Sequence, residues 1–153
     1  MTLKVFGSES SYFSLHDEND LLIGWIRDRT LGFRCFDSIT EARAAARIAY
    51  DVMIAACERL GASSVASPVG DAPLRIVNDG ASKWFTHDGM PIARLLAPRP
   101  DAVGDAAKFG IELIVPRGVG PVASIGVAQA IDVALARPQP TLPARETEQL
   151  ASA

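Results

Sequence analysis

The sequence predicts an α+β fold of two ββββα repeats related by a pseudo-two-fold axis, with antiparallel strands and two packed helices. Residues 3–17 and 74–88 align without a gap at a constant offset of 71, with four identical positions. Residues 49–55 and 130–136 repeat a helical pattern at an offset of 81, again with four identities. The composition, 48% hydrophobic and 22% charged, is that of a globular chain with a real core.

We expect one domain over residues 1–137, built from repeats at 1–61 and 73–137 that are joined by a linker at 62–72. The linker is rich in Ser, Pro and Gly, which is typical of a flexible connection. The polar, Pro-rich residues 138–153 are expected to form a disordered tail. A four-stranded meander with one helix can hardly cover its own apolar face, so the two repeats should share one core.

Four short apolar segments of the first repeat have the pattern of antiparallel strands separated by turns. They lie at residues 3–6, 12–16, 21–27 and 30–36. Alternation along the last three predicts inward-facing side chains for Phe13, Leu15, Leu21, Ile23, Trp25, Leu31, Phe33 and Cys35. Cys35, together with Cys57 in the following helix, is therefore interpreted as a buried free thiol rather than as half of a disulfide.

A helix is expected to follow the fourth strand and to run to about Leu60, where Gly61 offers the left-handed ending. Ser38 and Glu41 form a capping box, in which the serine hydroxyl accepts a first-turn amide and Glu41 accepts the amide of Ser38. The apolar face of this helix is wide enough to contact the sheet and a further surface. That surface is either the second helix or another subunit, which leaves a homodimer open.

The second repeat has the same order of elements. Its strands are expected at residues 74–77, 82–87, 91–97 and 109–115. Asp88-Gly89 predicts a tight hairpin, since both central residues tolerate a positive φ. Pro121 is a favoured first helical residue, and the closing helix is expected to run to about Ala136.

Charge and hydropathy limit the location and the partners of the protein. The net charge is −3 and the isoelectric point is near 5.3, which argues against broad electrostatic capture of nucleic acid or of an anionic membrane. Residues 1–5 show no signal-peptide pattern, and the apolar segment 119–136 is short and carries Ser124, Gln129 and Asp132. We therefore expect a cytoplasmic protein with no membrane partner.

The motifs do not predict a catalytic residue or a cofactor. Residues 118–123 have Gly-x-Gly-x-x-Ala spacing, but a dinucleotide site also needs a following parallel strand and a distal acidic residue. The sequence has no Gly-x-Ser-x-Gly elbow, and neither cysteine lies where a helix N-terminus would activate it. Enzyme activity is therefore unsupported by the motifs.

The two histidines form a candidate symmetric polar pair, because His16-Asp17 and His87-Asp88 occupy equivalent strand ends. Two facing imidazoles, with Glu112 as a third ligand, would bind a divalent metal and support a metal-dependent enzyme. The competing interpretation is local, with each aspartate closing its own hairpin by accepting backbone amides.

Arg27, Arg29 and Arg34 make the third–fourth hairpin of the first repeat basic, and Trp25 and Phe33 make it aromatic. A ribbon of this kind can enter a DNA groove, stack on single-stranded bases or engage an acidic protein. The favoured function is a non-catalytic binding or interaction module, which engages a protein or a small ligand at the sheet surface or in the groove between the repeats. Nucleic-acid binding through the three arginines is the first alternative, and the paired-histidine metalloenzyme is the second.

Overall fold

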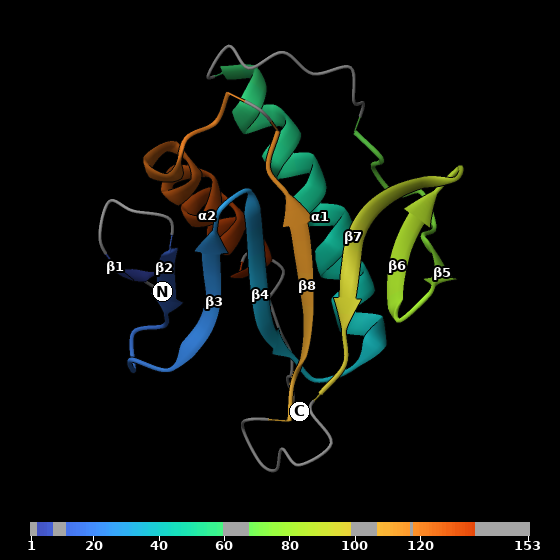
Figure 1. Ribbon diagram of the computed structural model, residues 1–153, viewed down its shortest axis with the longest axis horizontal. Coiled ribbons are helices and arrows are strands. Elements are labelled where there is room, and N and C mark those ends of the chain that lie inside the picture. The colour runs from blue at the N-terminus through green and yellow to red at the C-terminus, as the bar shows by residue number, and fades with distance from the viewer. Residues whose placement is uncertain (1–2, 8–11, 60–67, 99–106, 117, 137–153) are drawn as a thin grey trace, which may run out of the picture.

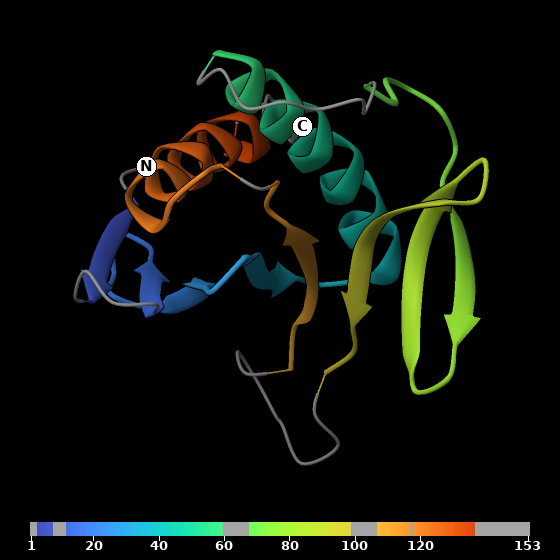
Figure 2. The same ribbon diagram turned by 45° about the horizontal axis from the view of Figure 1, so that its top comes forward.

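The computed structural model describes residues 3–7, 12–59, 68–98, 107–116 and 118–136. Within these ranges, eight strands form one antiparallel sheet, and both helices lie on the same face of it (Figure 1 and Figure 2). The α+β class is therefore confirmed. The expected tail at 138–153 and the linker residues 62–67 lie outside the described residues.

All ten elements form close to their expected positions. The strands are β1 (Lys4–Gly7), β2 (Tyr12–His16), β3 (Leu22–Arg27), β4 (Thr30–Phe36), β5 (Arg75–Asp79), β6 (Ser82–His87), β7 (Met90–Leu96) and β8 (Phe109–Ile114). The helices are α1 (Ile39–Arg59), between β4 and β5, and α2 (Pro121–Ala136), which follows β8. The capping and turn signals account for several of these bounds. Asp88 and Gly89 have φ values of 50° and 80°, as the tight turn before β7 requires.

The cap of α1 has the expected residues in a slightly different arrangement. The backbone amide of Glu41 donates to Ser38 Oγ at 3.1 Å, as predicted for the first turn. Glu41 Oε1 accepts the amide of Asp37 at 3.2 Å, rather than the amide of Ser38. The Glu41 side chain therefore caps the residue before Ser38, and this bond also holds the chain where it leaves β4.

The sheet has the order β1-β2-β3-β4-β8-β7-β6-β5, so β4 and β8 join the two halves of the chain at its centre. The helices cross over this junction. α1 follows β4 but packs on β7 and β8 as well as on β4, whereas α2 follows β8 and packs on β3. The two helices also pack against each other, which confirms the expected helix–helix contact. One continuous hydrophobic core lies between the helices and the sheet.

The predicted inward orientation of Trp25 is wrong because β3 contains a bulge. The ladder with β2 skips one residue between Leu22 and Gly24, so that Ile23 is extra and is buried together with Gly24. One inserted residue reverses the alternation of a strand relative to its partner. Trp25 consequently lies on the sheet face that carries no helix, and Leu21 is exposed rather than inward.

A second irregularity corrects the prediction for Cys35. The pairing of β4 with β8 shifts between Arg34 and Phe36, and Phe36 takes the buried position instead. Cys35 is exposed, whereas Cys57 is buried as expected, and both are free thiols. The alignment of the two repeats at a constant offset of 71 does not match structurally equivalent positions in β2 and β6. Phe13 of β2 is buried, whereas the aligned Trp84 of β6 lies on the other face of the sheet.

Candidate functional site

The three arginines of the basic hairpin do not gather in one patch. Arg27 and Arg29 are exposed at the turn between β3 and β4. Arg34 lies five residues beyond Arg29, about 16 Å along an extended strand. Its Nη1 donates to the carbonyl oxygens of Ala97 at 2.9 Å and Lys108 at 3.1 Å. Arg34 therefore ties together the ends of β7 and β8, away from the other two guanidinium groups.

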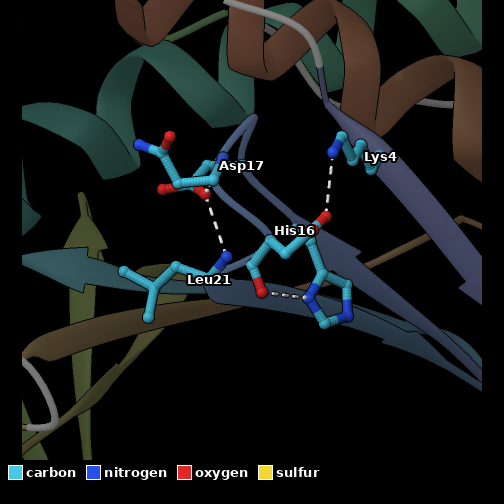
Figure 3. Close-up of polar contacts among 6 residues, drawn as sticks. Lys4, His16, Asp17 and Leu21 are labelled. Carbon is cyan, nitrogen blue, oxygen red and sulfur yellow. Dashed lines mark hydrogen bonds and ion pairs between the residues drawn. The ribbon is translucent and has the colours of Figure 1, made fainter.

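The His16-Asp17 turn uses its side chains locally (Figure 3). Asp17 Oδ1 accepts the backbone amides of Asn19 at 2.8 Å and Leu21 at 2.9 Å. His16 Nδ1 hydrogen-bonds the carbonyl oxygen of Asp20 at 3.1 Å. These contacts close the β2–β3 hairpin, as the local interpretation of the His-Asp pair expects.

The second pair, His87-Asp88, lies far from the first. His87 Nε2 lies 3.5 Å from Asp88 Oδ2, within the turn that follows β6. Four strands separate β2 from β6, which at the usual strand spacing is roughly 24 Å. The structure therefore does not bring His16 and His87 together. Within the described residues, no group of three or more His, Cys, Asp or Glu side chains could share a metal ion.

Glu112, the proposed third ligand, belongs to a cluster on the face of the sheet that carries no helix. Trp25 Nε1 donates to its Oε2 at 3.0 Å, and Arg94 Nη2 donates to its Oε1 at 2.9 Å. The indole of Trp25 lies over Gly32, where a Cβ would approach the ring to 2.3 Å. The cluster thus spans four adjacent strands, β3, β4, β8 and β7, and both carboxylate oxygens of Glu112 are engaged.

One concave site lies between the helices and the sheet. A cavity of about 930 Å³ opens where β3 begins, β4 ends and α1 begins, at the lower edge of the sheet in Figure 1. Ligand pockets in proteins commonly enclose about 300–1,000 Å³, so the volume suits a small organic molecule. Its lining combines the first half of α1 and the ends of β3 and β4 with the end of α2. The helix that crosses over from the other half of the chain therefore completes the site.

The cavity walls are mostly aliphatic and aromatic. Ile23, Phe33 and Phe36 line the sheet side, while Ile48 and Leu135 line the helix side. Leu21 and Leu22 stand at the start of β3 with exposed fractions of 49% and 53%. Large aliphatic side chains left in water beside a cavity extend its apolar surface to the outside.

Two polar groups belong to this lining, the buried Asp132 and the exposed Cys35. Asp132 projects from α2 and is only 7% exposed. Burial raises the pKa of its carboxyl group. Cys35 reaches the cavity from β4, and although the cavity leaves it open to solvent, the surrounding protein raises the pKa of its thiol to about 11, with the Asp132 carboxylate contributing in the same direction. Both side chains line the same cavity.

The sequence prediction missed this site, although one signal was present. Asp132 is the only charged residue in the sixteen residues of α2. A single carboxylate in an otherwise uncharged helix would be expected on the solvent side, yet it faces the cavity. The sequence did not show that Asp132 would face β3 and β4 across the cavity, because nothing in α2 indicates that it packs on β3 rather than on the strands of its own half.

A scan of family models, a search of curated proteins and a search of solved structures each found no match to this chain. Neither helix of the described residues combines the length and the hydropathy that a bilayer crossing requires.

Proposed function

We propose that this protein is a non-catalytic binding protein that holds a small, largely apolar molecule in the cavity between its helices and its sheet. The observation that carries the proposal is the cavity of about 930 Å³ with its predominantly apolar lining. Apolar pockets with a few converging polar groups are the usual form of small-molecule sites. The exposed Leu21 and Leu22 at the rim support entry of an apolar ligand from this edge.

The chemistry of the lining favours binding over catalysis. Cys35 is the one cysteine that reaches the cavity, and a thiol with a pKa of about 11 is almost entirely protonated at neutral pH. Because the thiolate is the nucleophilic form, this side chain is poorly activated for covalent catalysis. The lining therefore offers no activated thiol to a bound molecule.

A neutral fluorescent probe tests the proposal. We expect 1-N-phenylnaphthylamine to gain fluorescence on mixing with the protein, with saturation at one equivalent. Ala44 lines the cavity from α1, and the substitution Ala44→Phe should fill part of the space that the probe needs. The expected loss of affinity is tenfold or more, about 1.4 kcal/mol.

Ala55→Phe is the matched control, because Ala55 is exposed on the same helix and does not line the cavity. It makes the same change of side chain and should leave probe binding unaltered. No fluorescence gain with the unmodified protein would reject the proposal. Equal loss in both variants would mean that the probe does not occupy this cavity.

We also propose that the two ββββα units descend from one duplicated unit. The strand order reads β1 to β4 from one edge and β5 to β8 from the other, and each helix covers strands of the other unit, which supports a two-fold relation. A permuted protein tests this, with residues 68–136 placed before residues 3–59 through a glycine–serine linker. It should fold with the far-ultraviolet circular dichroism and cooperative melting of the original order, and an unfolded product would count against the relation.

A further inference from the structure

We propose that this protein forms a homodimer in which the β5 strands of two copies pair antiparallel, edge to edge, and join the two sheets. The inference goes beyond the proposed function, since none of the described residues that line the cavity belongs to β5. It rests on the open edge of β5 and on the order of charges along that strand.

The sheet has an open edge at β5. Its two edge strands are β1 and β5, and both views place β5 at the outer end of the sheet, beyond the helices (Figure 1 and Figure 2). All five residues of β5 are exposed, and the strand pairs with β6 without a break in register. Arg75–Asp79 contains no proline, lysine or bulge, which commonly prevent pairing at a sheet edge. By contrast, β1 has four residues and includes Lys4.

The free backbone groups of β5 come from two of its residues. Asp79 and Ser82 face each other across a two-residue loop, and the pair that closes such a loop exchanges hydrogen bonds. Hydrogen-bonded and non-hydrogen-bonded pairs alternate from there. Val77 therefore bonds to β6, whereas Ile76 and Asn78 direct their N–H and C=O groups to the open edge. An unpaired edge of this kind is a template for another strand.

The charges of β5 are complementary to those of a second copy. In an antiparallel pair with its two-fold axis at Val77, Ile76 lies opposite the partner's Asn78, and Arg75 lies opposite the partner's Asp79. This register joins the residues that have free backbone groups. The two contacts between Arg75 and Asp79 fall at non-hydrogen-bonded pairs, where side chains are closest. Both charged side chains are exposed, and neither forms an ion pair within the described part of the chain.

The apolar side chains favour the same register. Val77 is 47% exposed and lies opposite Trp84 on the face of the sheet without a helix. The two-fold axis places Val77 against the partner's Val77 and continues this apolar row into the second sheet. A register centred on Ile76 or Asn78 would instead place Val77 opposite the partner's Arg75 or Asp79. Pairing about Val77 is therefore the register that joins opposite charges and brings the valines together.

Sedimentation equilibrium of the full-length protein tests the inference first. Two short strands make a small interface, so we expect a monomer–dimer equilibrium with a dissociation constant of about 10–100 µM. A protein that stays monomeric at about 500 µM would overturn the inference and leave the edge of β5 to an extended segment of another protein.

Exchange of the two charges tests the register. Arg75→Asp and Asp79→Arg should each weaken self-association by about tenfold or more, because each puts like charges opposite each other across the axis. An equimolar mixture of the two variants should form a heterodimer, since one chain then has two acidic and the other two basic ends of β5. Arg27→Asp is the matched control: it makes the same change at an exposed position on β3 and should dimerise like the unmodified protein. Undiminished dimers in both β5 variants, or a mixture that stays monomeric, would overturn the inference.

A cross-link gives a second measurement that needs no charge reversal. Two cysteines at a non-hydrogen-bonded pair have the Cα separation that a disulfide requires. In a Cys35→Ser background, Val77→Cys should therefore form an intermolecular disulfide on mild oxidation. Val133→Cys makes the same change at an exposed position of α2 and should stay largely monomeric. Equal cross-linking of the two variants would contradict pairing through β5, even if a charge variant fails to fold.

Discussion

Replacing Gly32 by alanine should destabilise the protein, although alanine normally stabilises a strand. A Cβ at this position would lie 2.3 Å from Cζ2 and 2.4 Å from Cε2 of Trp25, whereas ordinary contacts are 3.4–4 Å. The indole must therefore move by about 1 Å. That displacement breaks the 3.0 Å hydrogen bond from Trp25 Nε1 to Glu112, whose side chain is only 13% exposed.

The magnitude follows from two opposing effects. A hydrogen bond to a charged group contributes about 1.5–3 kcal/mol to stability. Relief of the conformational entropy of glycine offsets this by about 0.5–1 kcal/mol. We expect Gly32→Ala to lower the free energy of unfolding by about 1–2 kcal/mol, as measured by urea denaturation with circular dichroism.

Two further variants make the reasoning refutable. Gly126→Ala lies in α2 with open space around the new methyl group, and it should stabilise the protein by about 1 kcal/mol. If Trp25→Leu is introduced first, Gly32→Ala should become neutral or stabilising, because the ring that it meets is gone. A stabilising Gly32→Ala in the original protein, or an undiminished loss in the Trp25→Leu background, would show that the indole does not pack over Gly32.

Three other predictions concern pH, thiol chemistry and the helix cap. Because burial raises the pKa of Asp132, the unfolded chain releases this proton at a lower pH than the folded protein does. The free energy of unfolding should therefore fall as the pH rises from the ordinary pKa of 3.8 through the pKa of the folded protein. In calorimetric scans at pH 7, Asp132→Asn should melt at a higher temperature than the original protein. Below pH 3.8 the two proteins should melt at the same temperature. The reaction of Cys35 with a chromogenic disulfide should accelerate about tenfold per pH unit between pH 8 and 10, because the pKa of its thiol is about 11. Buried Cys57 should react only after unfolding. A Cys35 reaction rate that levels off near pH 9 would contradict the raised pKa. Ser38→Ala should lower the free energy of unfolding, measured by urea denaturation, by about 1 kcal/mol, because the Glu41 amide loses its capping hydroxyl. Thr40→Ala is an exposed change in the same turn and should alter the free energy of unfolding by less than about 0.5 kcal/mol.

Local signals predicted where several of the elements begin. Ser38 and Glu41 mark the start of α1, Pro121 marks the start of α2, and Asp88-Gly89 sets the turn before β7. Each signal acts through backbone groups within a few residues, so a single sequence contains all the information needed. The alternation of apolar residues likewise placed the buried side chains of β8 correctly.

The errors arose where one residue changes the face of a whole strand. The bulge at Ile23 moved Trp25 out of the core, and the shift before Phe36 exposed Cys35. A bulge depends on the register with a neighbouring strand, which local composition does not determine. The cavity could not be predicted for the same reason. The orientation of Cys35 and the packing of α2 on β3 both depend on how the whole sheet assembles.

The crossed helices also constrain how the chain can be made. The inner surface of β3 is covered by α2, the last element of the described chain, and β3 leaves the ribosome well before α2 does. Throughout translation of about a hundred further residues, that surface has no permanent cover. Nascent chains stalled before Pro121 should accordingly recruit chaperones and resist compaction, and emergence of α2 should trigger a single late collapse.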